Sequence, residues 1–291
     1  MSVRCLVVEN DPTAGLGHFA EWLTDGGLAL EVVRPHAGEA LPEVLAGSAA
    51  ADSASGGSAS GGSASGGSAS AGSSALADYG ALVVLGGHQP AYPAADGTPS
   101  SPWFPTLEAL LRHAVREQVP TLGICLGAQL LAQAHNGTVA PAAAGPEIGP
   151  ALVAKRDAAE SDPLFGPLPM LPDVIQWHGD EITQLPLGAV LLATSTGCPV
   201  QAFRLGSVAW GVQFHPEVDL PTLAAWAAAD DPLLERVNVD LDLMLDQAAQ
   251  LEDDLFEVWH PFAIRFAAVA TGTLTPPPSV QPARRLPLLG S

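Results

Sequence analysis

The 291-residue sequence predicts an α/β fold: a mostly parallel, doubly wound sheet flanked by helices, with an additional small β-ladder and C-terminal helices. Residues 3–8 form an apolar run of the kind found in buried parallel strands, residues 28–33 supply a second strand, and a helical stretch separates the two. A short apolar strand before Cys125 passes directly into a helix. The ladder is predicted from three successive β-type runs: residues 189–193, 201–204 and 208–214.

The other elements follow from periodicity and turn residues. The first helix is expected over residues 16–24, where Gly26-Gly27 ends it. Residues 81–85 form a third strand that leads into a Gly86-Gly87-His88-Gln89 turn, and proline-rich residues 90–105 form a loop that could cover a site. Further helices are predicted at 107–115, 126–135, 220–229 and 233–258, and further strands at 138–139 and 152–154. Residues 174–180 are predicted to be a strand that runs into a loop. The last helical stretch carries exposed acidic residues: Asp240, Asp242, Asp246, Glu252, Asp253 and Asp254.

Composition divides the chain into five segments. Residues 1–45 hold the first strands and helix, and residues 46–75 are an insertion rich in serine, alanine and glycine. Within it, residues 53–72 repeat Ser-Ala-Ser-Gly-Gly and offer no aromatic, β-branched or charged side chain, so flexibility is predicted. Residues 76–230 form the core with the chemical motifs, 231–270 a C-terminal helical extension, and 271–291 a proline-rich tail expected to be disordered.

Charge and cysteine content limit the classes of function. A formal net charge of −20 argues against nucleic acid or an anionic membrane as a partner. Cys5, Cys125 and Cys198 have neither paired nor metal-ligand spacing, so we expect no metal site and a reducing compartment. The first residues lack the pattern of a secretory signal, and no apolar run reaches membrane-spanning length, so a cytoplasmic location is expected.

Cys125 is the first candidate catalytic residue. Gly123 and Gly127 flank it on the sharp turn between strand and helix, which is the spacing of a nucleophile elbow. A thiol at this place meets the positive end of the helix dipole, which favours the thiolate. Taken alone, the motif also fits a buried structural cysteine at a strand end.

A second motif, Gln-Phe-His-Pro-Glu at residues 213–217, follows a predicted strand and places His215 one residue from Glu217. Such a pair supplies a base and a carboxylate that orients it. Gly-Ile-Cys-Leu-Gly-Ala-Gln at 123–129 and this second motif, in this order, resemble the class I glutamine amidotransferases. The resemblance covers roughly residues 78–230 and is closest to stand-alone members similar to the glutaminase domain of GMP synthase. Leu85-Gly86-Gly87-His88 is a weaker third match.

The resemblance implies a role for each matched residue. Cys125 is the nucleophile, His215 the base and Glu217 its orienting carboxylate, while the backbone N–H groups of Gly87 and Leu126 form the oxyanion hole. It also implies that Gln129, His178 and Gly179 lie at the substrate, although His178 fits a hydrogen-bonded structural histidine equally well. His88 departs from the family, which commonly has proline there. No metal or organic cofactor is implied.

The resulting expectation is a small-molecule enzyme that hydrolyses glutamine through a γ-glutamyl thioester and releases ammonia. Because the residues after about 270 are too few for a synthetase domain, the acceptor would be a separate synthetase subunit. One alternative is a γ-glutamyl peptide or γ-glutamyl amine hydrolase. Another is a non-catalytic regulatory relative, but the presence of Cys125, His215 and Glu217 argues against it. A further alternative is membership of another α/β family that also carries a cysteine on such an elbow. The separate Gln-Phe-His-Pro-Glu motif argues against it.

Overall fold

The computed structural model describes residues 2–44, 76–229 and 233–276. The predicted insertion at 46–75 and the tail beyond residue 276 lie outside these ranges. The strands are β1 (Val3–Val8), β2 (Leu28–Val33), β3 (Ala81–Val84), β4 (Thr121–Ile124), β5 (Thr138–Pro141), β6 (Glu147–Leu152), β7 (Ala154–Lys155), β8 (Asp173–His178), β9 (Asp180–Gln184), β10 (Val190–Thr194), β11 (Ala202–Leu205) and β12 (Ala209–Val212).

The helices are α1 (Phe19–Asp25), α2 (Phe104–Arg116), α3 (Leu126–Ala134), α4 (Leu220–Ala228), α5 (Leu241–Gln250) and α6 (Glu252–Ala270), with short 3₁₀ turns η1 (Pro35–Ala37), η2 (Asp157–Ser161) and η3 (Leu234–Arg236). In the described residues an eight-stranded sheet has the order β2-β1-β3-β4-β12-β11-β10-β7. The first five strands in this order, β2, β1, β3, β4 and β12, pair in parallel. The last three, β11, β10 and β7, continue the sheet with antiparallel pairing. The α/β fold class is confirmed.

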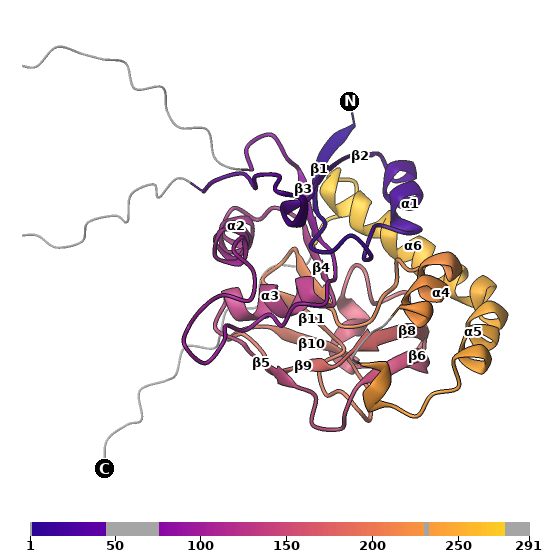
Figure 1. The fold of residues 1–291 in the computed structure, drawn as a ribbon. Helices are drawn as coiled ribbons and strands as arrows, with labels where there is room; N and C mark the ends of the chain where they lie inside the picture. Colours follow the sequence, from indigo (N-terminus) through magenta and orange to yellow (C-terminus); the bar gives the residue numbers. More distant parts are fainter. Residues whose placement is uncertain (1, 45–75, 230–232, 277–291) are drawn as a thin grey trace, which may run out of the picture.

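Helices cover both faces of this sheet (Figure 1). Side chains of β1 alternate between two cores: Cys5 and Val7 pack with residues of α1 and α6, and Leu6 and Val8 pack with residues of α2 and α3. Because both faces are buried there, the strand is apolar from Cys5 to Val8, whereas Arg4, near its start, is exposed.

The predicted ladder is part of the main sheet, as its antiparallel half. The small sheets are instead the antiparallel pairs β5-β9 and β6-β8. The predicted strand at 152–154 is divided, since β6 ends at Leu152 and β7 begins at Ala154. Strand β9 was not predicted, because a strand this short, directly after His178-Gly179, has no turn residues of its own to mark it.

Three helix boundaries differ from the prediction. The first helix begins at Phe19 because Gly17, with φ of +47°, turns the chain before it. The predicted helix 233–258 is interrupted: the Asp240 carboxylate accepts a hydrogen bond from the Leu243 N–H at 3.1 Å and caps a new helix, α5. Helix α6 then runs past Pro261 to Ala270. The residues immediately after it are ordered, since the Thr273 N–H donates to the Ala268 carbonyl at 2.9 Å.

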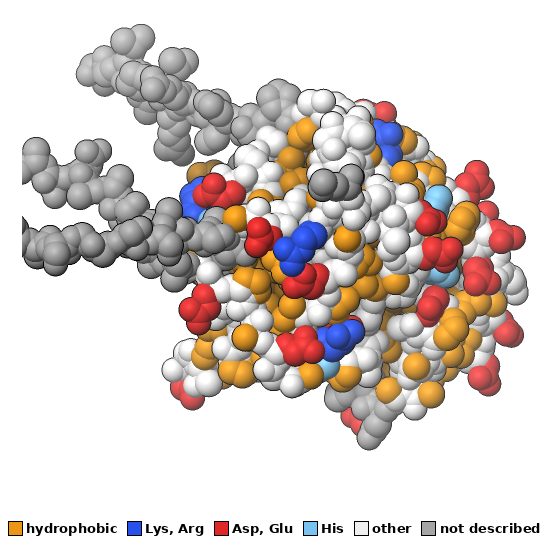
Figure 2. Space-filling view, turned by 90° about the horizontal axis from the view of Figure 1, so that it is seen from above, with side chains coloured by type: hydrophobic (Ala, Val, Ile, Leu, Met, Phe, Trp, Pro, Cys, Tyr) orange, Lys and Arg blue, Asp and Glu red, His pale blue; other side chains and the backbone are white. Residues whose placement is uncertain are grey.

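The surface reflects the acidic composition. Figure 2 shows red acidic side chains spread over the visible face and fewer blue basic ones. The acidic residues predicted to be exposed near α5 and α6 are exposed. Within the described ranges, none of the helices combines the length and the apolar character that crossing a membrane requires.

Candidate active site

Cys125 lies between β4 and α3 with a backbone φ of +50° and ψ of −109°. Both flanking glycines are needed for this connection. A Cβ atom on Gly127 would overlap the Val84 carbonyl oxygen, and one on Gly123 would lie 2.6 Å from the Gly127 carbonyl carbon. The absence of these side chains lets strand and helix approach closely and presents the thiol at the turn.

His215 and Glu217 follow the end of β12 and form a buried pair. The His215 Nδ1 lies 2.7 Å from Glu217 Oε1, and the His215 backbone N–H donates to the Ile175 carbonyl at 2.8 Å. Because Nδ1 faces a carboxylate, it carries a proton, which leaves Nε2 as the nitrogen that can exchange one. Burial by itself lowers the pKa of His215, but the charge of Glu217, followed by that of Cys125, outweighs burial and raises this pKa to about 10.

The loop after β3 brings the thiol and the imidazole together. A Cβ atom on Gly86 would lie 3.0 Å from His215 Cε1 and 3.6 Å from Cys125 Cβ, so this glycine touches both residues. A Cβ atom on Gly87 would lie 2.9 Å from Leu126 Cδ2, so the two residues predicted for the oxyanion hole are neighbours. Leu126 is the first residue of α3, where a backbone N–H has no acceptor within the helix.

His88 follows this loop and is half exposed. Its Nδ1 lies 3.6 Å from Asp11 Oδ2, which ties the loop to the turn after β1. This contact supports the segment that carries His88.

Gln129 is buried and is linked to the thiol through Gln213. Its Nε2 donates to the Asp180 carbonyl at 3.3 Å and to Gln213 Oε1 at 3.1 Å. Gln213 Nε2 in turn lies 3.6 Å from Cys125 Sγ. In the sequence Gln213 is only one member of a motif, and its contact with the thiol depends on the pairing of β12 with β4, which the sequence does not specify.

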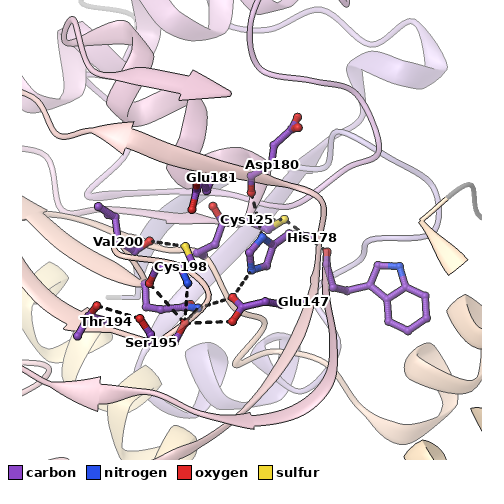
Figure 3. A network of polar contacts seen from close by, with 12 residues as sticks. Cys125, Glu147, His178, Asp180, Glu181, Thr194, Ser195, Cys198 and Val200 are labelled. Atoms are coloured by element: carbon purple, nitrogen blue, oxygen red, sulfur yellow. Dashed lines mark hydrogen bonds and ion pairs between the residues drawn. The ribbon is translucent and has the colours of Figure 1, made fainter. Parts of the chain in front are cut away.

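His178 has both ring nitrogens in use. Nδ1 lies 2.9 Å from the Asp180 carbonyl oxygen and Nε2 lies 3.0 Å from Glu147 Oε2 (Figure 3). The ring is buried, with 1% of the side chain exposed. These contacts match the structural alternative for His178, although the residue also lines the cavity above Cys125.

Glu147 holds His178 and was not predicted. Its carboxylate also accepts hydrogen bonds from Ser195 Oγ at 3.0 Å and from Gln201 Nε2 at 2.7 Å. Burial alone would raise the pKa of Glu147, but hydrogen bonding to His178 and these partners lowers it. No local sequence pattern identifies Glu147, because its partners come from β8 and from the segments beside β10 and β11.

Among the described residues, Glu147, His178 and Cys198 are the group whose side chains could bind a metal, with ligand atoms within 4.8 Å of one another. The group does not fit a metal site well. The Cys198 thiol donates to the Val200 carbonyl at 3.4 Å, and both ring nitrogens of His178 lie within hydrogen-bond distance of protein oxygens. The Glu147 oxygens are already engaged. We therefore describe the cluster as a support for His178.

A cavity of about 340 Å³ opens above Cys125. The predicted residues Gly87, Gln129, His178 and Gly179 line it, whereas His215 and Glu217 do not. Its volume falls within the range of about 300–1,000 Å³ that is usual for small-molecule sites. His88 and Gln89 of the turn after β3 also line it, as do Pro90 and Tyr92 of the proline-rich loop 90–105. The lining residues that sequence reasoning did not connect with a site are Trp177, Asp180, Leu233 and Arg236.

Comparisons with known proteins identify the family. A family model described as glutamine amidotransferase class-I matches residues 72–225. The chain is 43% identical over 111 residues to one subunit of the glutamine-hydrolysing GMP synthase of Thermococcus kodakarensis, a match that covers 38% of this chain and 57% of that protein. It is 41% identical over 122 residues to the glutamine-hydrolysing GMP synthase of Thermomicrobium roseum, over 42% of this chain and 22% of that protein. The chain therefore spans less than two thirds of these relatives.

Among solved structures, a glutamine amidotransferase from Thermotoga maritima matches with a TM-score of 0.71 and 26% identity, covering 92% of this chain and 99% of that one. A glutamine amidotransferase from Methylobacillus flagellatus matches with a TM-score of 0.68 and 22% identity, over 97% of this chain and 99% of that one. The second match bears on the fold alone.

Proposed function

The chain belongs to the class-I glutamine amidotransferase family, and we propose that it hydrolyses the side-chain amide of glutamine through a thioester on Cys125. The observation that carries the proposal is the meeting of Cys125, on its elbow, with the His215–Glu217 pair at Gly86. A nucleophile, a base and a carboxylate that orients the base are the parts that this reaction requires.

In the proposed reaction the Cys125 thiolate attacks the amide carbon of glutamine. His215 gives its proton to the departing nitrogen, the C–N bond breaks, and ammonia leaves. A water molecule, deprotonated by His215, then attacks the thioester carbon and releases glutamate, which restores the thiol. Glu217 keeps the proton of the imidazole on Nδ1 and stabilises the imidazolium.

The oxyanion that forms in each step needs hydrogen-bond donors. We assign this role to the backbone N–H groups of Gly87, which lines the cavity, and Leu126, which lies next to Gly87 in space. Gln129 and Gly179 line the same cavity and are proposed to border the bound glutamine. His178 is proposed to act there by contact of its ring, since both of its nitrogens are bonded to protein atoms.

The use of the ammonia is proposed by analogy. The relative from Thermococcus kodakarensis is named as one subunit of a GMP synthase. We propose that this chain likewise passes ammonia to a separate synthetase subunit.

A γ-glutamyl amine or peptide hydrolase is the second candidate. The cavity extends beyond Gln129 to Tyr92, Leu233 and Arg236, which offers side chains to a substituent on the amide nitrogen. The same Cys125 chemistry would apply, with an amine as the leaving group in place of ammonia.

The test is glutamate release by the purified protein from L-glutamine and from γ-glutamyl amines. We expect Cys125→Ala to abolish turnover and His215→Ala to reduce it about a thousandfold or more. Glu217→Gln should cost less than the loss of the nucleophile or the base, because Glu217 orients the base and does not take the proton. Cys5→Ala, which alters a buried thiol on β1, is the matched control and should keep nearly full turnover.

A glutamine-mimicking electrophile adds an independent measurement. It should label Cys125 and spare Cys5 and Cys198, since burial raises the pKa of both of those thiols to about 12. Turnover of γ-glutamyl amines but not of glutamine would replace the first candidate by the second. No turnover of any compound, with or without a synthetase partner, would leave a non-catalytic relative.

A further inference from the structure

Arg236 lines the cavity above Cys125 but comes from a part of the chain outside the family match, which ends at residue 225. It is the last residue of the short turn η3, between α4 and α5. The motifs at Cys125 and His215 therefore do not account for this side chain.

The turn that carries Arg236 is anchored. Leu233 and Leu234 pack against a buried cluster that includes Ile175, Trp177 and Trp226. The Arg236 backbone N–H donates to the Leu233 carbonyl at 3.1 Å. The guanidinium therefore extends from a fixed backbone.

Gly179, which lines the cavity, packs against Leu233 and Arg236. A Cβ atom on Gly179 would lie 3.3 Å from Arg236 Nη1 and would overlap the Leu233 side chain. The glycine thus lets the turn close over the strand end beside His178. This position explains why the predicted substrate residue at 179 has no side chain.

In the part of the chain that the structure describes, the Arg236 guanidinium makes neither an ion pair nor a hydrogen bond with a protein group. The charge of Asp180, which also lines the cavity, attracts that of Arg236, and Asp180 Oδ1 accepts a hydrogen bond from the Tyr92 hydroxyl at 3.4 Å. Arg236 is exposed at the cavity, so its guanidinium N–H groups remain available to a bound anion.

We propose that Arg236 binds a carboxylate of the substrate and so selects carboxylate-bearing γ-glutamyl compounds. The inference rests on the proposed function, because it assigns an anion to the same cavity. A guanidinium presents paired N–H donors that match the two oxygens of a carboxylate. The carboxylate can be the α-carboxylate of the γ-glutamyl group, which glutamine carries, or one on the leaving amine, which glutamine lacks.

Steady-state kinetics with Arg236→Gln distinguishes these sources. The substrates are L-glutamine, γ-glutamylmethylamide and γ-glutamylglycine, of which the last alone has a carboxylate on the leaving amine. Arg156→Gln is the control, because it removes the same charge from an exposed residue outside the cavity lining. We expect KM to rise about tenfold in Arg236→Gln, with kcat within about twofold.

An equal rise in KM for all three substrates assigns Arg236 to the α-carboxylate, and a rise for γ-glutamylglycine alone assigns it to the leaving amine. A KM that changes no more than in Arg156→Gln, for every substrate, overturns the inference.

A binding measurement separates this result from failure of the proposed chemistry. Calorimetric titration of L-glutamine and γ-glutamylglycine into Cys125→Ser, with and without Arg236→Gln, needs no turnover. Loss of Cys125-dependent turnover with an intact difference in binding would reject the hydrolase and keep the role of Arg236. The role of Arg236 would be rejected if Cys125→Ser bound each ligand with the same affinity whether or not it also carried Arg236→Gln. It would also be rejected if neither protein bound either ligand.

Discussion

His215 is buried between Glu217 and Trp226. The centroids of the His215 and Trp226 rings lie 4.8 Å apart. A pKa of about 10, against an ordinary value of 6.5, makes it an imidazolium at neutral pH. The carboxylate of Glu217 compensates for the burial of this charge, so the pair contributes to stability as well as to the proposed chemistry.

This pair predicts a pH dependence of folding. Since the pKa of His215 is higher in the folded state than in the unfolded one, its contribution is complete below about pH 6.5 and is lost as the pH rises to about 10. In Glu217→Gln the opposing charge is gone, so the decline should be shallower. Melting temperatures of both proteins between pH 6 and pH 10 test this, and parallel curves would contradict it.

Sequence reasoning selected individual residues where the chemistry is local. Cys125 was found because its flanking glycines are neighbours in sequence, and His215 and Glu217 because they share one turn. Their assigned roles remain predictions. Glu147 and Arg236 could not be found in this way, because each gains its meaning from a partner on another element.

At the scale of elements, the close approach of β3 and α3 depends on Gly127. We expect Gly127→Ala to lower the free energy of unfolding by about 1–3 kcal/mol or more, because its Cβ would overlap the Val84 carbonyl oxygen. Since α3 would have to move away from the sheet, glutamine turnover should also fall. Urea denaturation and the glutamate assay measure the two effects.

The control for this substitution is Gly15→Ala. A Cβ atom on Gly15 would find its nearest neighbour, Glu9 Oε2, at 4.0 Å, so stability should change by no more than about 0.5 kcal/mol. Equal losses in the two variants would show that the elbow does not need its glycine.

The elements themselves were predictable to different degrees. The strands β1 and β2 appear in the sequence as apolar runs, interrupted once each by Arg4 and Glu31, and their predicted bounds are confirmed. The break between α5 and α6 was missed because Leu251 fits the apolar period on both sides of it. Asp240, expected to be one of several exposed acidic residues, is the cap that begins α5.

At the scale of the molecule, α6 belongs to the main core. Its Trp259 packs against Phe214 at 4.9 Å between ring centroids, and its Phe266 against Trp210 at 6.4 Å. The sequence predicted residues 231–270 as an extension, because helical periodicity shows that one face is buried but not which surface covers it.

Removal of α6 should therefore prevent folding. Burial of each such aromatic residue contributes about 1.5–3 kcal/mol, and several of them approach the roughly 5–15 kcal/mol that stabilises a whole domain. A chain ending at residue 232 should lack near-ultraviolet circular dichroism and cooperative urea unfolding. A chain ending at residue 276, which retains α6, is the control and should unfold cooperatively. Cooperative unfolding of the shorter chain would show that α6 is dispensable.

The packing of α6 against the strand that leads to His215 also has a consequence for biosynthesis. On the ribosome, Cys125 and His215 emerge before Trp259 and Phe266, the residues that cover the β12 side of the sheet. We therefore expect Cys125 and His215 to reach their final arrangement only after α6 has left the exit tunnel. A nascent chain would thus carry both side chains before the packing that positions them is complete.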